Sequence, residues 1–493
     1  MLGPGAVRSA HPEPRTQDRE RYPKIRERYN VFVRKTLALL AIVALAATGA
    51  LFIQRLNQDE HYKRLLANGE AALAAGQSYV AIEAFSGALA LRPSSMVAFY
   101  RRGEAYAIEG QNARAILDLQ EARRLAPDAP EPLEALGRLF DHQGNPAEAA
   151  DWFAQAAERL KDADPALLYT LALARYRAGT PASARDPLRR ALARNDSMAE
   201  AHYLLGLVYR DAQQPEEAMA SLERAVRLAP SLLAAREELA DLYRERGQLA
   251  DEARELGALA SLDQQLDRQI ALALAHMRAG RYPEALDTLK RPDDVATSDS
   301  RVALTTGRIY LARAERTGDR ASVTLALTSL ERALGGTARR SEGLALFGRA
   351  LYLTGNYAGS ERLLKDAIAT TPIDTEAFAF LADAAERVSH PDVARDALLG
   401  LDALEGDTVS ADVRAARARR IGGLAVAAGD GRTGVEYLTL AIKAGLTDAS
   451  TLGLLARAQW QMGNRDDARR TLGEALALDA RDADLRRLSR VIR

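Results

Sequence analysis

The stretch Gly429-Asp-Gly431-Arg-Thr-Gly434 has the glycine spacing of the loop that binds the pyrophosphate of a dinucleotide. Such a loop follows a strand and opens a helix, and an acidic residue about 20 positions later holds the ribose. The apolar residues Leu424–Ala428 could form that strand. These glycines, however, also fall on positions of a helical repeat where turns and close helix contacts require small residues. We therefore interpret them as structural glycines and expect no cofactor.

Histidines are the next candidates for chemistry. The chain has 6 of them, and none stands three or four residues from another, the spacing at which two side chains on one helix share a metal ion. His202 and His276 occupy helical positions that normally pack, so we expect both between helices. Asp141-His142 has no third ligand beside it, and Asp293-Asp294 is an acidic pair in an expected loop. We predict no metal site.

The motifs of common enzymes are missing from the sequence. It contains no Walker motif, no H-E-x-x-H, no G-x-S-x-G and no EF-hand loop. It also contains no cysteine, which excludes a catalytic thiol, a structural disulfide and a zinc–thiolate site. Carboxylates are plentiful, but at this abundance most are solvated helix faces. We expect no catalytic residues and no enzyme activity.

Charge is distributed unevenly along the 493 residues. The formal net charge is zero, with 67 basic and 67 acidic residues. Residues 1–35 hold nine Lys or Arg and four acids, a net of +5, so the remainder must carry −5. A mildly acidic body with dispersed charges argues against nucleic acid, which is bound by a concentrated basic face.

A fixed period dominates the sequence after residue 62. Gly69, Gly103 and Gly137 are 34 residues apart, and alanines repeat the same interval twelve positions later at Ala81, Ala115 and Ala149. Between these small residues, apolar side chains recur every three or four positions, which indicates helices. A repeated pair of helices stacks on its neighbours to complete a core, and a chain of such pairs forms a solenoid.

This pattern resembles the tetratricopeptide repeat (TPR) family, and membrane-anchored bacterial members in particular. The resemblance implies an all-α, right-handed superhelical solenoid of about twelve helix pairs. The small residues at the eighth position of each predicted pair are Gly69, Gly103, Gly137, Ala172, Gly206, Ala240, Ala273, Gly307, Gly348, Ala382, Gly422 and Ala456. The carboxylate-clamp pattern of chaperone-binding TPR proteins is missing, because Leu66 and Glu70 stand where its first lysine and asparagine would be.

The sequence predicts six segments. The stretch from Arg291 to Asp299 interrupts the period and reads as a loop, so we place a boundary between two arrays within it. The segments are a disordered basic tail (1–35), a transmembrane helix (36–53), a linker (54–61), an amino-terminal array (62–292), a carboxy-terminal array (293–480) and a capping helix (481–493).

The apolar segment Thr36–Ile53 contains 18 residues without a charge. At ~1.5 Å per residue it spans about 27 Å, close to the hydrocarbon thickness of a bilayer. An uncleaved membrane anchor is the leading interpretation. A cleaved signal peptide with its site near Thr48-Gly49-Ala50 and a buried solenoid helix are the alternatives.

The flanks of this segment predict its orientation. Seven Lys or Arg lie within 20 residues before it, and three, Arg55, Lys63 and Arg64, lie soon after it. The positive-inside rule leaves the tail in the cytosol and the repeats on the other side. In a Gram-negative inner membrane that side is the periplasm.

In TPR proteins the first helix of each pair lines a concave surface, and the resemblance implies that this surface binds a partner. Tyrosine suits such a wall because it offers a flat apolar face and a hydroxyl. The alternative is that the tyrosines only fill gaps between adjacent helices. The predicted binding residues are Tyr100, Glu104, Arg138, Tyr169, Tyr176, Tyr203, Arg210, Asp241 and Arg244.

The expected function is therefore that of a membrane-anchored scaffold for protein partners. Similar TPR proteins serve in cell-envelope assembly and exopolysaccharide export. A cytosol-facing adaptor held at the membrane is the alternative of the same class. A TPR-associated glycosyltransferase is the alternative of another class, and the repeats leave no room for its catalytic domain.

Overall fold

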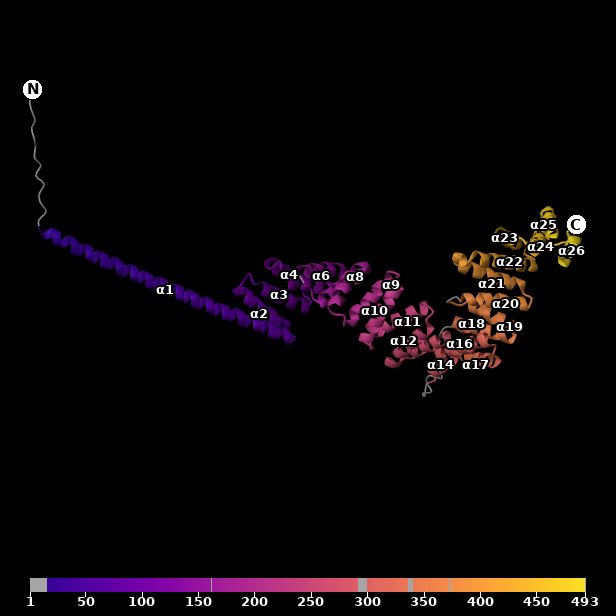
Figure 1. The fold of residues 1–493 in the computed structure, drawn as a ribbon, viewed down its shortest axis with the longest axis horizontal. Coiled ribbons are helices and arrows are strands. Elements are labelled where there is room, and N and C mark those ends of the chain that lie inside the picture. The colour runs from indigo at the N-terminus through magenta and orange to yellow at the C-terminus, as the bar shows by residue number, and fades with distance from the viewer. Residues whose placement is uncertain (1–15, 161, 291–298, 336–339, 372–373, 493) are drawn as a thin grey trace, which may run out of the picture. The chain divides into compact units, whose positions relative to one another are not determined.

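The computed structural model contains helices and no strand among the residues that it describes, which are 16–160, 162–290, 299–335, 340–371 and 374–492. Successive helices pack on each other in pairs, α1 on α2, α3 on α4, and onward to α24 on α25 (Figure 1). The chain divides into two compact units, and the boundary in the sequence lies between Leu228 and Ala229. The boundary expected at residues 292/293 falls outside the described residues and stays a prediction.

Unit 1 ends at Leu228. Its helices are α1 (Thr16–Ala74), α2 (Ser78–Leu91), α3 (Met96–Ile108), α4 (Asn112–Leu125), α5 (Glu131–His142), α6 (Pro146–Arg159), α7 (Pro165–Arg177), α8 (Pro181–Arg194), α9 (Ala199–Asp211) and α10 (Pro215–Leu228).

Unit 2 begins at Ala229. Its helices are α11 (Leu233–Glu245), α12 (Leu249–Leu262), α13 (Leu266–Arg278), α14 (Tyr282–Thr288), α16 (Ser300–Thr317), α17 (Arg320–Leu334), α18 (Arg340–Thr354), α19 (Tyr357–Ile368), α20 (Thr375–Arg387), α21 (Pro391–Glu405), the 3₁₀ turn η1 (Gly406–Thr408), α22 (Ala411–Ala427), α23 (Gly431–Lys443), α24 (Ala449–Gln461), α25 (Arg465–Leu478) and α26 (Ala483–Val491).

The periodic glycines let the two helices of a pair approach closely. A Cβ at Gly103 on α3 would lie 2.9 Å from the Leu119 Cγ on α4, closer than real side chains come. A Cβ at Gly137 would lie 2.6 Å from the Phe153 ring. Between α3 and α4, Gly110 has φ +72, a left-handed conformation that glycine adopts without steric cost. The repeat pattern thus sets both the contact and the turn.

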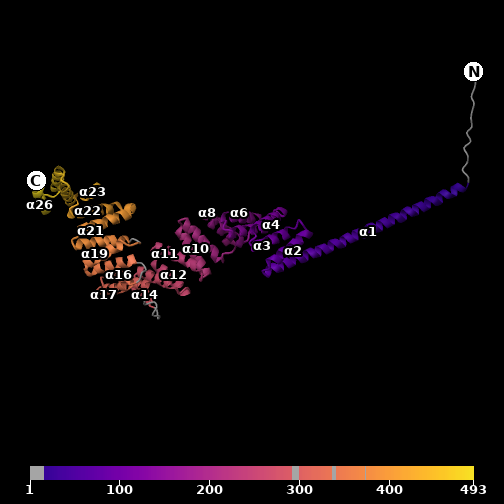
Figure 2. The same ribbon diagram turned by 180° about the vertical axis from the view of Figure 1, so that it is seen from behind.

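The segment α1 is one unbroken helix of 59 residues (Figures 1 and 2). It includes residues 16–35, which we expected to be disordered, and residues 54–61, which we expected to be a linker. Neither glycine nor proline occurs between Ala50 and Ala67, and most of these residues favour helix, so nothing ends the helix before the first repeat.

From Asn30 to Ala74, α1 is the one helix among the described residues that is long and apolar enough to cross a membrane. Its most apolar 18-residue window is not buried at all within the molecule. Leu45, for example, keeps 71% of its surface exposed. A membrane span and a signal sequence both meet this description, and a buried solenoid helix does not.

At the other end, the amphipathic helix α26 packs against α24 and α25. Its Leu485 and Leu488 join the core cluster that contains Leu452 and Ala456 of α24. Most of its other positions hold polar or charged residues, including Arg486 and Arg487. One apolar face on an otherwise polar helix is what closes a stack of repeats.

Candidate binding surface

The first helices of the pairs in unit 1 are linked to each other by ion pairs. Arg101 on α3 reaches Glu70 on α1 at 3.5 Å, and Arg177 on α7 reaches Asp141 on α5 at 3.0 Å. These contacts place the corresponding faces of α1, α3, α5 and α7 side by side. The faces form the surface on which the sequence predicted a partner.

Glu104 is the centre of the polar contacts on this surface. Its carboxylate accepts hydrogen bonds from the Tyr100 hydroxyl at 2.8 Å and from Arg101 Nη1 at 3.0 Å. It also accepts one from Arg138 Nη2 at 3.2 Å, across from α5. Arg138 lies 3.7 Å from Glu134 on its own helix. Three predicted residues, Tyr100, Glu104 and Arg138, are therefore in direct contact.

Burial changes the protonation behaviour of this group. Burial, together with the negative charge of Glu104, raises the pKa of Tyr100 to about 12. Burial also raises the pKa of Glu134, and the nearby Arg138 opposes that change. Tyr100 packs beside the core cluster of Leu119, Ala135 and Leu136. It thus contributes to packing between α3 and α5 while its hydroxyl bonds to Glu104.

The other predicted tyrosines lie farther along the same surface. Tyr169 and Tyr176 on α7 and Tyr203 on α9 are half-buried. Burial raises the pKa of Tyr169, and burial and a hydrogen bond with Asp211 raise that of Tyr176. Arg210 on α9 lies 3.5 Å from Asp211.

A cavity of about 620 Å³ opens on this surface, and we call it the α3–α5 cavity. Glu104 and Arg138 stand on its wall beside apolar side chains and neutral polar ones. Its lining residues are Leu73, Glu104, Ala107, Ile108, Asn112, Leu119, Ala135, Arg138, Leu139, His142 and Gln143. Its size is that of a site for a small ligand or for one or two side chains of a partner.

Most of the apolar lining was missed in the sequence. Leu73 and Ala107 hold the twelfth position of their repeats, and Ile108 holds the thirteenth. These residues lie on first helices of their pairs, which form the predicted surface, but we selected tyrosines and charged residues from it. Ile108 is 66% exposed, which is unusual for isoleucine in a folded chain. An isoleucine at a surface position of the repeat was the signal available.

The last two predicted residues belong to unit 2. Asp241 and Arg244 both lie on α11 and are exposed, and their side chains pair at 2.8 Å. The structure therefore distributes the predicted set over two units, with seven residues in unit 1 and two in unit 2.

Unit 2 has a cavity of its own, of about 580 Å³, which we call the α16–α18 cavity. Charged residues dominate it. Arg308 pairs with Glu342, and Arg349 pairs with Glu315 at 2.9 Å and also with Glu376. Its lining residues are Met277, Arg308, Leu311, Ala312, Glu315, Glu342, Leu346, Arg349, Asp374, Thr375 and Glu376.

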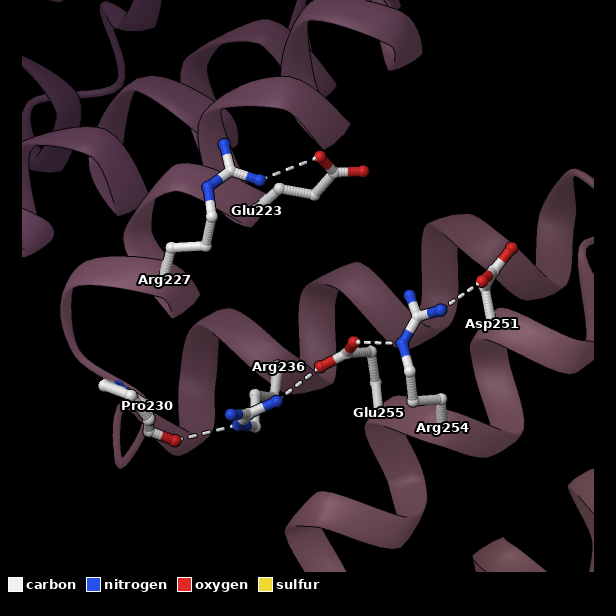
Figure 3. Close-up of polar contacts among 7 residues, drawn as sticks. All are labelled: Glu223, Arg227, Pro230, Arg236, Asp251, Arg254 and Glu255. Carbon is white, nitrogen blue, oxygen red and sulfur yellow. Dashed lines mark hydrogen bonds and ion pairs between the residues drawn. The ribbon is translucent and has the colours of Figure 1, made fainter.

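Buried ion pairs position helices within unit 2. Figure 3 shows Glu255 of α12 between Arg236 and Arg254. Arg236 Nη1 lies 2.6 Å from the Glu255 carboxylate, and both side chains are largely buried, at 13% and 7% exposure. Arg236 Nε also donates to the Pro230 carbonyl oxygen at 2.8 Å. These bonds tie α11 to α12 and to the segment before α11.

The glycine-rich stretch has the structural role that the repeat predicts. Leu424 lies in helix α22, which runs to Ala427, so no strand precedes the glycines. Gly429 forms the turn with φ +82, and the Asp430 carboxylate accepts a hydrogen bond from the Thr433 backbone at 3.1 Å, at the start of α23.

The histidines differ in their surroundings. His202 is buried and its Nε2 lies 3.0 Å from Asp196, as expected for a packed histidine. His276 is half-buried, and burial lowers its pKa. Asp141 is engaged by Arg177, while His142 lines the α3–α5 cavity. Among the described residues no three metal-binding side chains gather in one place. Asp293-Asp294 lies outside the described residues.

Comparison with known sequences identifies the repeats of residues 66–232. A profile of the tetratricopeptide repeat matches residues 66–130, 109–166 and 169–232. These residues carry tetratricopeptide repeats. In unit 1 the matched TPR segments include every lining residue of the α3–α5 cavity and the predicted tyrosines, so the candidate surface lies on recognised repeats.

Individual proteins align with parts of this chain. DnaJ homolog subfamily C member 3 of Gallus gallus is 28% identical over 251 residues, 45% of this chain and 50% of the relative. The chain thus spans about half the length of this curated relative. The structure of YrrB, described as a TPR protein with an unusual peptide-binding site, aligns with TM-score 0.36 and 18% identity. That alignment covers 39% of this chain and 98% of YrrB. MamA aligns with TM-score 0.33 and 22% identity over 34% of this chain and 92% of MamA.

Proposed function

We propose that this TPR protein is a non-catalytic, membrane-anchored scaffold and that the α3–α5 cavity of unit 1 receives a segment of a protein partner. Tetratricopeptide repeats form protein-interaction scaffolds, which supports the general class. The cavity supports the location, because it joins exposed apolar surface to polar side chains that can bond a peptide backbone. Asn112 and Gln143 at its edge supply such amide groups.

Ile108 provides the sharpest test. It lines the cavity and is 66% exposed, whereas Leu117 on α4 is 67% exposed and is not among the lining residues. We expect Ile108→Glu to lower partner capture at least tenfold, because it places a charge in the apolar contact, while Leu117→Glu leaves capture unchanged. Pull-down from detergent-solubilised membranes, quantified by mass spectrometry, measures both.

Because both residues are exposed, neither substitution affects the core, and circular-dichroism melting should give the same midpoint for the two variants. Equal capture by the two variants would place the partner elsewhere on the surface.

We further propose that α1 anchors the chain in a membrane with its amino terminus in the cytosol and the repeats outside, in cell-envelope assembly or polymer export. The apolar, exposed segment and the basic residues before it support this topology. A reporter that is active only outside the cytosol, fused after Arg493, should be active. Activity of a cytosol-only reporter at the same position would instead favour the cytosol-facing adaptor.

A further inference from the structure

The end of the apolar segment lies next to the first helix pair. The helix α2 runs back along α1, so its last residue, Leu91, shares a shallow depression with Ala50, Ile53, Gln54 and His61 of α1. Arg92, just after α2, pairs with Asp59, and its guanidinium lies 4.1 Å from the centre of the Tyr62 ring. The turn between α2 and α3 is thus fixed beside the residues that follow Ile53.

The helical rise per residue gives the position of this contact relative to the bilayer. Residues 54–58 cover about 7 Å at ~1.5 Å per residue, and the polar headgroup layer on each side of a bilayer is about 5–7 Å thick. If residues 36–53 cross the hydrocarbon core, Gln54, Asn57 and Gln58 lie among headgroups. Leu91 and Arg92 then lie at the same level. At the opposite end of the pair, Gln77 is 24 residues beyond Ile53, about 36 Å farther from the membrane.

The composition of this end suits a lipid surface. Arg55, Lys63, Arg64 and Arg92 are exposed and basic, and the acidic residues near them are Asp59 and Glu60. Asp59 is paired with Arg92 and Glu60 with Lys63 at 3.3 Å, so the local excess is two positive charges. Basic residues beside a span attract anionic lipids, and neutral amides such as Gln54 and Asn57 are compatible with headgroups.

We propose that this juxtamembrane end, residues 54–58 of α1 together with residues 91–95, rests on anionic lipid headgroups. The proposal rests on the membrane anchor proposed above. In this arrangement the membrane is a second binding partner of the first repeat, and the α3–α5 cavity is held at a set height above it.

The absence of cysteine allows a direct test, because one introduced cysteine carries the only label. Spin labels are placed in the full chain at Ser94→Cys, in the α2–α3 turn, and at Gln77→Cys, in the α1–α2 turn. A third label, at Leu45→Cys, lies within the apolar segment. The protein is reconstituted in phosphatidylcholine vesicles with or without phosphatidylglycerol, and relaxation by a headgroup-attached nickel chelate is compared with relaxation by a water-soluble one.

We expect the Ser94 label to be relaxed by the headgroup-attached chelate, more strongly with phosphatidylglycerol, and the Gln77 label to respond only to the water-soluble reagent. The double substitution Arg55→Gln with Arg64→Gln should remove the phosphatidylglycerol dependence. The matched pair Arg190→Gln with Arg227→Gln, on exposed arginines of α8 and α10, should leave it intact.

The Leu45 label separates the two proposals. If it is shielded from the water-soluble chelate while the Ser94 and Gln77 labels behave alike, the anchor holds and the headgroup contact is wrong. If the Leu45 label is open to water, or mass spectrometry shows a chain cleaved near Ala50, the anchor itself is wrong and this inference fails with it.

Discussion

The cavities of the two units occupy equivalent places in the repeat and differ in chemistry. In unit 1, the α3–α5 cavity combines an apolar lining with a single group of charges around Glu104. In unit 2, the α16–α18 cavity is lined by Arg308, Arg349 and several carboxylates, which pair across α16, α18 and α20. Both cavities contain ion pairs between helices, but exposed apolar side chains such as Ile108 stand beside them only in the α3–α5 cavity, whereas charged residues dominate the α16–α18 cavity.

This difference shows that the surface formed by the first helices changes in chemistry from one unit to the other. Charged side chains that already pair with the next repeat would only exchange one partner for another, so binding there gains little. Exposed apolar side chains such as Ile108, by contrast, stabilise a complex when a partner removes them from water. We therefore expect binding to concentrate in unit 1 and the charged cavity of unit 2 to add mainly to cohesion.

The largest expected effect concerns the tyrosines of unit 1. Replacing Tyr169 and Tyr203 together by alanine should weaken partner capture by ~2 kcal/mol or more for each ring that the partner buries. A double substitution in unit 2, Asp241→Ala with Arg244→Ala, removes an exposed pair and should change capture little. Pull-down and circular-dichroism melting of the same samples provide the measurement.

A lower melting temperature for the tyrosine variant would show that these rings fill gaps between helices, since each core truncation costs about 3–5 kcal/mol. Loss of capture in the Asp241 and Arg244 variant would extend the binding surface into unit 2 and weaken the comparison.

The next effect tests cohesion in unit 2. Arg236→Met should destabilise the protein by about 3 kcal/mol, because it leaves the buried Glu255 carboxylate with Arg254 as its remaining partner. Arg227→Met in unit 1 is the matched control, because the Arg227–Glu223 pair is exposed, at 59% and 39% (Figure 3). Urea unfolding measures the free energy of unfolding of both variants. An equal loss in the two would contradict the role of the buried Arg236–Glu255 pair in stability.

The smallest effect is a pH dependence in unit 1. Because the pKa of Tyr100 is raised to about 12 from an ordinary value near 10, the folded protein holds this proton where the unfolded chain loses it. Stability should therefore be full below pH 10 and fall as pH rises from about 10 to about 12. Tyr100 is half-exposed, so we discount the contribution to about 1 kcal/mol.

Ultraviolet titration of the native protein against Tyr100→Phe isolates this one phenol. A difference spectrum that titrates near pH 10 would show that Tyr100 is neither buried nor in contact with Glu104 in solution.

The fold was largely predictable because its signals are local. Small residues such as Gly103 are forced by contacts within a helix pair, and Gly110 by the turn, so both appear at a fixed interval in the sequence. The twelve predicted eighth positions all lie in first helices of the pairs, from α1 to α24.

The continuity of α1 and the division into units were less predictable. Helical propensity continues through residues 54–61 without a stop signal, and we treated their polarity as a linker. The division at Leu228 depends on how densely helices contact each other, and no turn or insertion sets that position apart from other repeat boundaries.

The candidate site was predicted only in part. Glu104 and Arg138 were identified because charges at surface positions are conspicuous, and they do line the cavity. Leu73 and Ile108 were missed because an apolar residue in a helical repeat is usually in the core. Whether such a residue is covered depends on side chains of the neighbouring repeats. The sequence of a single repeat does not reveal this.

Because α1 is unbroken, its length affects the direction in which the first repeat faces. An α-helix turns by about 100° and advances about 1.5 Å with each residue. Between Ile53 and Tyr62 no glycine or proline interrupts this progression. If α1 crosses a membrane as proposed, the number of residues in that interval sets the direction in which the first repeat faces around the membrane normal, as well as its height. Adding one residue there would turn the α3–α5 cavity by more than a quarter circle without altering any residue that lines it.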